Sequence, residues 1–116
     1  VLPLTPETTG IMNAGFFAML ADGAFIINGG RGPQVDDDDL LAALDSGKLD
    51  GAALDVFAVE PLPQDHPFWT HPKVRVWPHV AAQTNATSAA EQVAAAITAM
   101  MDGSEPANCV DWLRGY

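Results

Sequence analysis

The stretch that decides the fold reads VRVWPHVAAQT and spans residues 74–84. Its alternating apolar residues predict a short buried strand, which Pro78 ends because proline cannot donate to a strand ladder. His79 therefore falls just past the carboxyl end of a strand, where open α/β sheets bind their ligands. A histidine at that place is suited to moving a proton, although a histidine beside a proline is also an ordinary loop residue.

Outward from this stretch, apolar runs and helical patterns alternate along the chain. Further strands are predicted over residues 1–4, 24–28 and 51–57, and the nearly continuous apolar run 24–28 suits burial on both faces of a sheet. Helices are predicted after Asn13, after the acidic run 36–39, and from a capping box formed by Ser88 and Glu91. This alternation predicts an α/β fold with a parallel sheet and right-handed crossovers.

The carboxyl ends of parallel strands lie on one edge of the sheet, so that edge is the predicted ligand site. We expect it to collect the segment 2–5, the loop Gly29-Gly30-Arg31, Asp55 and His79. The glycines permit close backbone approach to a ligand, and Arg31 is the only charge in its loop. Four separate segments thus bring their unusual residues to one place.

The aspartates at 36–39 invite a metal interpretation, but helix capping explains them better. Carboxylates at a helix N-terminus complement its dipole, and successive helix-terminal side chains point in different directions. We therefore expect no metal site. His66 and His71 both lie beside prolines in a loop and are interpreted as structural.

Composition limits the possible partners. The formal net charge is −10 with 5 basic residues, which argues against nucleic acid or an anionic membrane as a partner. Cys109 is the single cysteine, which fits a reducing compartment, and no apolar run approaches the roughly 18 residues of a membrane span. We expect a cytoplasmic protein.

The C-terminal part of the chain carries apolar side chains that need a partner. A helical pattern places Ala90, Val93, Ala94, Ile97, Met100 and Met101 on one face, which we expect to pack in a core. The tail carries Val110, Trp112, Leu113 and Tyr116 and should dock on an apolar surface. Because the chain opens at Val1 inside an apparent strand, we expect it to be a piece of a longer protein.

Four motifs in order carry a resemblance to a known family. They read LPLTPET (2–8), NGGRG (28–32), DVFAVEPLP (55–63) and PHVAA (78–82). Their order and spacing resemble the D-isomer-specific 2-hydroxyacid dehydrogenases along essentially the whole chain. Residues 79–82 and the ending Arg114-Gly115-Tyr116 are most similar to the glyoxylate/hydroxypyruvate reductases of the A type within that family.

The resemblance implies part of a doubly wound, Rossmann-like dinucleotide-binding domain. Residues 1–84 would be the C-terminal part of the NAD(P)-binding domain, and residues 85–116 a helix and tail that return to a substrate domain outside this chain. The glycine-rich pyrophosphate turn and the residue that separates NAD from NADP would precede Val1. The resemblance also implies a homodimer at full length, and we expect the 116-residue piece alone to be inactive.

The activity implied is hydride transfer from NAD(P)H, with NADPH slightly favoured, to glyoxylate, hydroxypyruvate or a similar 2-oxo acid, giving a D-2-hydroxy acid. Arg31 would bind the substrate carboxylate, His79 would protonate the keto oxygen, and Glu60 would orient the imidazole. Asp55 matches the family residue that hydrogen-bonds the nicotinamide carboxamide. The residues that match cofactor-lining segments are Leu2, Pro3, Thr5, Gly29, Gly30, Arg31, Asp55, His79, Ala81 and Ala82. Gly29-Gly30 replaces a bulkier pair usual before this arginine, which would loosen the loop.

Two alternatives from other classes stay open. A non-catalytic NAD(H)-sensing protein on the same scaffold could keep every one of these residues. A phosphoacceptor receiver domain would use Asp55, but it needs acidic residues after its first strand, where this chain has Leu2-Pro3-Leu4-Thr5. Without the resemblance, Arg31 is equally a solvated loop arginine and Glu60 a surface carboxylate.

Overall fold

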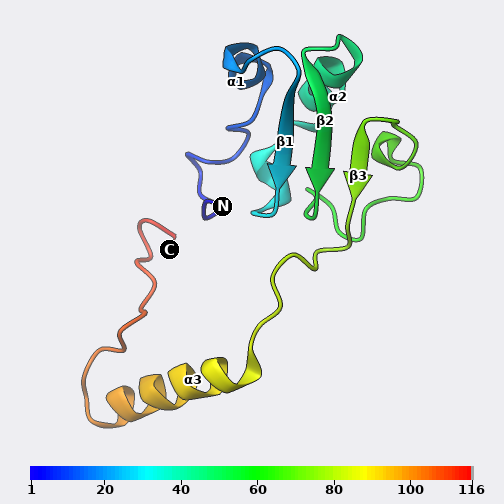
Figure 1. The fold of residues 1–116 in the computed structure, drawn as a ribbon. Coiled ribbons are helices and arrows are strands. Elements are labelled where there is room, and N and C mark those ends of the chain that lie inside the picture. Colours follow the sequence, from blue (N-terminus) through cyan, green and yellow to red (C-terminus); the bar gives the residue numbers. More distant parts are fainter. Residues whose placement is uncertain (116) are drawn as a thin grey trace. The chain divides into compact units, whose positions relative to one another are not determined.

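The computed structural model describes residues 1–115 and divides into two compact units, residues 1–81 and the segment from Ala82 onward. The first unit holds three strands, two α-helices and two short 3-10 helices (Figure 1). In chain order these are α1 (Ala14–Met19), β1 (Ala24–Asn28), η1 (Gly32–Gln34), α2 (Asp37–Asp45), β2 (Leu49–Leu54), η2 (Pro67–Trp69) and β3 (Val74–Val76). The second unit holds α3 (Ala86–Met101).

The sheet is parallel, with strand order β1-β2-β3, as the alternating pattern predicts. Asn28 pairs with Leu54 and Leu54 with Val76, so all three strands end level and point the same way in Figure 1. Pro78 follows two residues after β3 ends. The carboxyl ends of the three strands therefore form one edge of the sheet, as expected, and the loops that follow the strands start side by side.

The core lies between the sheet and the helices α1 and α2. Its largest fully buried side chains are Phe17, Phe68, Leu40, Leu44, Leu49 and Leu54. Asn13 caps α1 by accepting from the Phe16 amide, and Asp36 caps α2 by accepting from the Asp39 amide. Asp39 in turn accepts from the Ala14 amide at 2.7 Å, so the acidic run fastens the two helix starts together. The capping prediction for this run is confirmed.

Two predictions about the strands are wrong. Residues 1–4 form no strand, because the Leu2 and Pro3 carbonyls accept from a side chain, Gln34, and Pro3 has no amide hydrogen to donate. β1 is not buried on both faces: Phe25 is 70% and Ile27 81% exposed, since the helices of this unit cover one face of the sheet only.

The ends of two further elements also differ from expectation. The strand expected over 51–57 runs from Leu49 to Leu54, because its ladder to β3 ends at the Leu54–Val76 pair, and Asp55 follows it directly. α3 begins at Ala86 rather than at a Ser88–Glu91 capping box. Asn85 accepts from the Thr87 and Ser88 amides, each at 3.1 Å, and so starts the helix earlier.

The second unit contains no buried residue in α3. Val93, Ile97, Met100 and Met101 are exposed, so the core packing expected of this face is not found within the described residues. In the tail, Val110, Trp112 and Leu113 are exposed, and Tyr116 lies outside the described residues. Among the helices of residues 1–115, none is both long and apolar enough to cross a membrane.

Candidate active site

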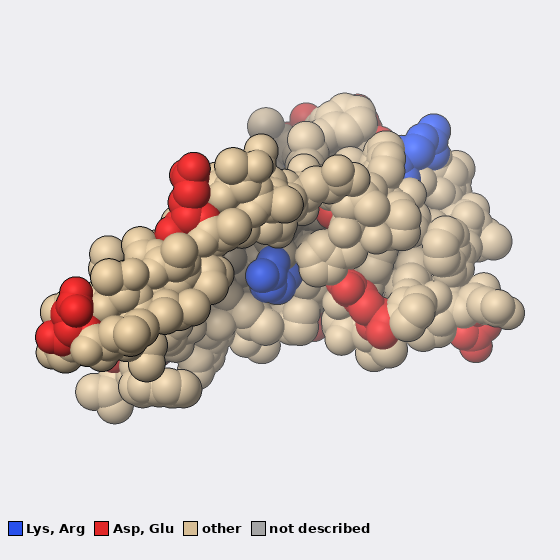
Figure 2. All heavy atoms as spheres, turned by 90° about the horizontal axis from the view of Figure 1, so that it is seen from below, with Lys and Arg blue, Asp and Glu red and all other residues tan. Residues whose placement is uncertain are grey.

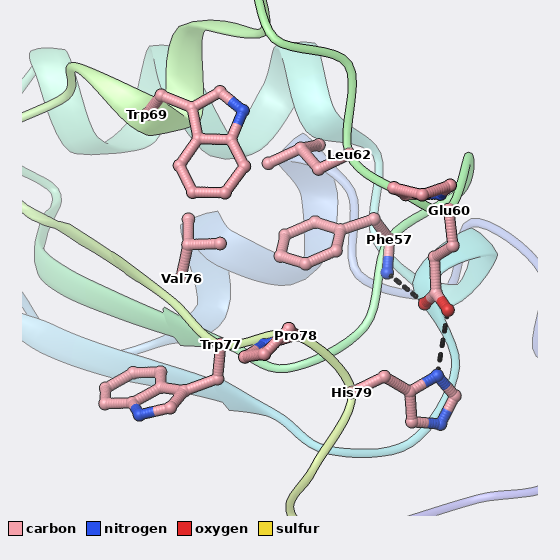
Figure 3. A pocket seen from close by; sticks show the side chains of 9 residues that line it. Phe57, Glu60, Leu62, Trp69, Val76, Trp77, Pro78 and His79 are labelled. Atoms are coloured by element: carbon pink, nitrogen blue, oxygen red, sulfur yellow. Dashed lines mark hydrogen bonds and ion pairs between the residues drawn. The ribbon is translucent and has the colours of Figure 1, made fainter.

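His79 and Glu60 form a hydrogen-bonded pair at the carboxyl edge of the sheet. The Trp77 amide still donates to the Leu54 carbonyl at 2.9 Å, but beyond Pro78 the chain turns at His79, whose φ is 57°. The His79 Nδ1 lies 2.8 Å from Glu60 Oε2, while Glu60 Oε1 accepts from the Phe57 amide at 2.9 Å (Figure 3). The glutamate is thus fixed by the backbone at one oxygen and holds the imidazole with the other.

The protonation of this pair follows from its hydrogen bonds. The bond to His79 and the bond from the Phe57 amide outweigh burial and lower the pKa of Glu60. An ionised carboxylate only accepts, so Nδ1 must carry the shared hydrogen, and Nε2 is left to hold or release a proton. The His79 side chain is 48% exposed, which leaves that nitrogen accessible.

Asp55 secures the turn that carries His79. Its Oδ1 accepts from the Val80 amide at 2.9 Å and its Oδ2 from the Ala81 amide at 2.8 Å. Burial opposes ionisation, but these two amide bonds and the nearby His79 outweigh it and lower the pKa of Asp55. A non-glycine residue at positive φ is strained, and the two bonds directly after His79 hold it there.

The receiver-domain alternative loses its support at the same residue. A phosphoacceptor aspartate must present a free oxygen to its phosphate donor and to magnesium. Both oxygens of Asp55 are instead engaged by backbone amides, and the side chain is buried.

Arg31 lies on a loop that is held by hydrogen bonds from two buried side chains, Asn28 and Gln34. Asn28 Oδ1 accepts from the Gly30 amide at 3.0 Å, and Asn28 Nδ2 donates to the Arg31 carbonyl at 3.1 Å. One guanidinium nitrogen, Nη1, donates to the Gly30 carbonyl at 2.7 Å. A Cβ on Gly32 would lie 1.8 Å from the Phe57 carbonyl carbon, so the Arg31 loop packs directly against the backbone whose amide holds Glu60.

Sequence reasoning missed Gln34. It is 3% exposed, its Nε2 donates to the carbonyls of Leu2 (3.0 Å) and Pro3 (3.1 Å), and its Oε1 accepts from the Arg31 amide at 3.1 Å. The available signal was a polar residue flanked by Pro33 and Val35 inside a short turn, which is too weak to separate it from a solvated position.

The hollows at this edge divide the predicted residues into groups. One of about 390 Å³ has Gly29, Asp55 and Ala81 in its lining, and one of about 210 Å³ has Leu2, Gly29 and Gly30. A third, of about 420 Å³, lies between Trp69 and Trp77 and reaches Glu60 and His79 (Figure 3). Gly29 lies opposite Ala81, where a Cβ would meet the Ala81 Cβ at 3.8 Å, so small residues keep the first hollow open.

Not every predicted residue joins these groups. Thr5 is buried within its own turn, where its amide donates to Thr8 Oγ1 at 2.8 Å. Arg31 makes no ion pair with Glu60 or any other carboxylate among residues 1–115. Ala82 belongs to the second unit. Figure 2 shows lysine and arginine side chains at scattered places on the visible face rather than as a continuous patch.

Curated relatives of known name match the whole chain. It is 54% identical over 116 residues to glyoxylate/hydroxypyruvate reductase A of Serratia proteamaculans and 51% identical to that of Yersinia enterocolitica. In both cases the match covers 100% of this chain and 37% of the relative. The chain therefore spans well under half the length of these relatives.

Solved structures also match the whole chain. A D-isomer specific 2-hydroxyacid dehydrogenase from Xanthobacter autotrophicus Py2, in complex with NADPH and MES, is 48% identical with a TM-score of 0.95, over 100% of this chain and 48% of that one. An NADPH-dependent glyoxylate/hydroxypyruvate reductase from Sinorhizobium meliloti, in complex with NADP and sulfate, is 44% identical with a TM-score of 0.92, over 100% and 38%. The parallel sheet is thus part of a Rossmann-like domain.

The family model described as D-isomer specific 2-hydroxyacid dehydrogenase, NAD binding domain, matches residues 1–81, which is the first compact unit. The resemblance that the four motifs indicate is therefore confirmed. The chain belongs to the D-isomer-specific 2-hydroxyacid dehydrogenase family.

Proposed function

We propose that the whole protein transfers hydride from NAD(P)H to a small 2-oxo acid of the glyoxylate or hydroxypyruvate class. The observation that carries the proposal is the Glu60–His79 pair, in which an ionised carboxylate leaves Nε2 of an accessible imidazole as the proton-carrying atom. The names of the relatives from Serratia and Yersinia support the substrate class.

Each residue has a defined role in this proposal. His79 donates its Nε2 proton to the keto oxygen, and Glu60 stabilises the imidazolium and holds the ring in place. Arg31 binds the substrate carboxylate, for which a planar guanidinium is suited. Asp55 holds the turn that presents His79, and this is a different use from the contact to a nicotinamide carboxamide that the resemblance implies.

The hollow of about 390 Å³ fits the nicotinamide end of a dinucleotide. Its lining is mostly apolar and includes the polar residues Asn28 and Asp55, and Gly29 and Ala81 leave room for a flat ring. Leu2, Pro3 and Gly30 would continue this contact. When bound, the reduced nicotinamide supplies the hydride.

The cofactor and the assembly complete the proposal. NADPH is favoured over NADH, because the Xanthobacter and Sinorhizobium structures contain NADPH and NADP. Residues 1–84 would form the C-terminal part of the NAD(P)-binding domain and residues 85–116 a helix and tail that return to the substrate domain. The whole protein would be a cytoplasmic homodimer.

The test is oxidation of NADPH and NADH by the full-length protein with glyoxylate and hydroxypyruvate, beside its His79→Gln variant. We expect the variant to lose about 10²- to 10⁴-fold in kcat, the usual contribution of a general acid, and to keep its cofactor affinity. His66→Gln is the matched control, since it also removes a histidine paired with a carboxylate, and it should stay within about threefold.

A different outcome would favour the sensing alternative. If the full-length protein binds NAD(P)H but reduces no 2-oxo acid, the same scaffold serves as an NAD(H) sensor. A partner recovered by pull-down only in the presence of NADH would then identify its role.

A further inference from the structure

The buried amide of Gln34 joins two segments that the proposed function needs side by side. Its nitrogen donates to the carbonyls of Leu2 and Pro3, and its oxygen accepts from the Arg31 amide, all between 3.0 and 3.1 Å. Leu2 and Pro3 lie more than 30 residues before Gln34 in the chain, whereas Arg31 lies three residues before it. No other described side chain forms hydrogen bonds to both segments.

The direction of the Arg31 guanidinium depends on this anchor. No carboxylate among residues 1–115 pairs with it, and its only hydrogen bond is from Nη1 to the neighbouring Gly30 carbonyl at 2.7 Å. That carbonyl is oriented by the backbone on either side of it. Gln34 fixes the Arg31 amide and Asn28 fixes the Gly30 amide, so two buried side chains set where the guanidinium points.

Gly30 and Gln34 are matched in size. A Cβ on Gly30 would lie 2.6 Å from Gln34 Oε1 and 3.4 Å from Asn28 Oδ1. The end of a glutamine side chain is usually free to move aside, but this one is 3% exposed and holds three backbone groups. The absence of a side chain at Gly30 thus makes room for the Gln34 amide that holds the loop.

We propose that Gln34 is a positioning residue that sets the orientation of Arg31 against the Leu2–Pro3 segment and so determines how well the protein binds the carboxylate of its substrate. The inference rests on the proposed function, because it assigns a structural cause to the role of Arg31 there. Gln34 acts through the backbone of Arg31 and does not touch the substrate itself.

The first test is the Gln34→Met variant of the full-length protein, which keeps the length of the side chain and removes its amide. Removing the bonds from Gln34 to the Leu2 and Pro3 carbonyls and to the Arg31 amide should misplace the guanidinium, and we expect KM for glyoxylate to rise roughly tenfold or more. The dissociation constant of NADPH, followed by its fluorescence, should change less than about threefold.

Thr8→Val is the matched control. The Thr8 hydroxyl also donates to the Pro3 carbonyl, at 2.7 Å, but has no bond to the Arg31 loop. An equal rise of KM in Thr8→Val would mean that any loosening of the Leu2–Pro3 segment has the same effect, which would overturn the proposal.

Two double-variant comparisons separate positioning from general loosening. In an Arg31→Lys background, Gln34→Met should raise KM further by less than about threefold, because the guanidinium that Gln34 positions is already absent. Gly30→Ala should raise KM as Gln34→Met does, because its Cβ would lie 2.6 Å from Gln34 Oε1. In a Gln34→Val background, which itself raises KM because the amide is gone, Gly30→Ala should raise KM further by less than about threefold, since the clashing oxygen is absent. Fully additive effects in both comparisons would contradict the proposal.

The outcomes keep the two proposals apart. If the unaltered protein has no 2-oxo acid reductase activity, the proposed function fails and this inference fails with it. If the unaltered protein turns over and Gln34→Met leaves KM unchanged, the proposed function stands and this inference alone is wrong. Should Gln34→Met not fold, Gly30→Ala gives the same decision.

Discussion

Two regions of the first unit each pair a histidine with a carboxylate, and they use the pair differently. At the carboxyl edge of the sheet, His79 Nδ1 lies 2.8 Å from Glu60. At the start of α2, His66 Nε2 lies 3.5 Å from Asp37. The pKa of Glu60 is lowered by its bonds to His79 and the Phe57 amide, whereas burial, aided by the neighbouring aspartates, raises the pKa of Asp37 against the attraction of His66.

The difference lies in which ring nitrogens are already engaged. In His66, Nδ1 accepts from the Phe68 amide at 3.3 Å, Nε2 faces Asp37, and the ring lies 4.5 Å from that of Phe68. His71 is similar, with Nδ1 accepting from the Lys73 amide and Nε2 lying 3.2 Å from Asp45. A histidine with both nitrogens engaged fastens a loop, while His79, with Nε2 unpaired among the described residues, can move a proton.

The largest effect should come from Glu60→Gln. The Phe57 amide needs an acceptor and will take the oxygen of the new side chain, which turns its NH₂ group toward His79. Nδ1 must then accept, and the imidazolium loses its counter-charge. We expect kcat for glyoxylate to fall by about a hundredfold or more, measured by NADPH oxidation.

Asp37→Asn is the control for this prediction, because it neutralises the carboxylate of the other pair. It should leave kcat within about threefold. Equal losses in the two variants would mean that the two histidine–carboxylate pairs do not differ in function.

Asp55→Asn should have the next largest effect. An asparagine can accept from one of the Val80 and Ala81 amides but turns its own NH₂ toward the other, so the turn that holds His79 at positive φ loses a bond. We expect kcat/KM to fall by about ten- to a hundredfold, as for a misplaced catalytic group. Asp65→Asn, on an exposed loop carboxylate, should change it less than about twofold.

Titration distinguishes the two carboxylates without a substitution. Glu60 has a lowered pKa, so its bond to His79 stabilises the folded state at neutral pH and is lost only as the pH falls through that lowered value. Asp37 has a raised pKa, so its cost to the folded state develops as the pH rises from the usual aspartate value to the raised one, is complete above that, and is absent in acid. Carboxyl NMR titration should show that the pKa of Asp37 lies above the usual range of an aspartate and the pKa of Glu60 below the usual range of a glutamate. A shift in the opposite direction at either residue would contradict these assignments.

The sequence predicted the convergence at the sheet edge because strand ends and motif order are local signals. Asp55, Glu60 and His79 do meet there, and Asn13 and Asp36 cap their helices as expected. The partners of each group were not predictable in the same way. Both oxygens of Asp55 face the backbone of a turn 25 or 26 residues away, which no local pattern encodes.

Burial was the other part that the sequence could not settle. An apolar pattern indicates that a face needs cover but does not say what covers it. Phe25 and Ile27 of β1, like Val93 and Ile97 of α3, are exposed among the described residues although their pattern is that of a core. Gln34 shows the converse, since a polar side chain in a turn is buried because three backbone groups need its amide.

The smallest effect should come from the His66–Asp37 pair itself. Ion pairs of this kind contribute less than about 1 kcal/mol to the free energy of unfolding, and the raised pKa of Asp37 means that its charge disfavours the folded state at neutral pH. Asp37→Asn should therefore keep or slightly raise the denaturant midpoint at pH 7. His66→Gln should lower it slightly, because the Phe68 amide loses its acceptor and the ring leaves Phe68. A loss of several kcal/mol in Asp37→Asn would contradict the raised pKa of Asp37, because it would mean that the charged carboxylate stabilises the folded state.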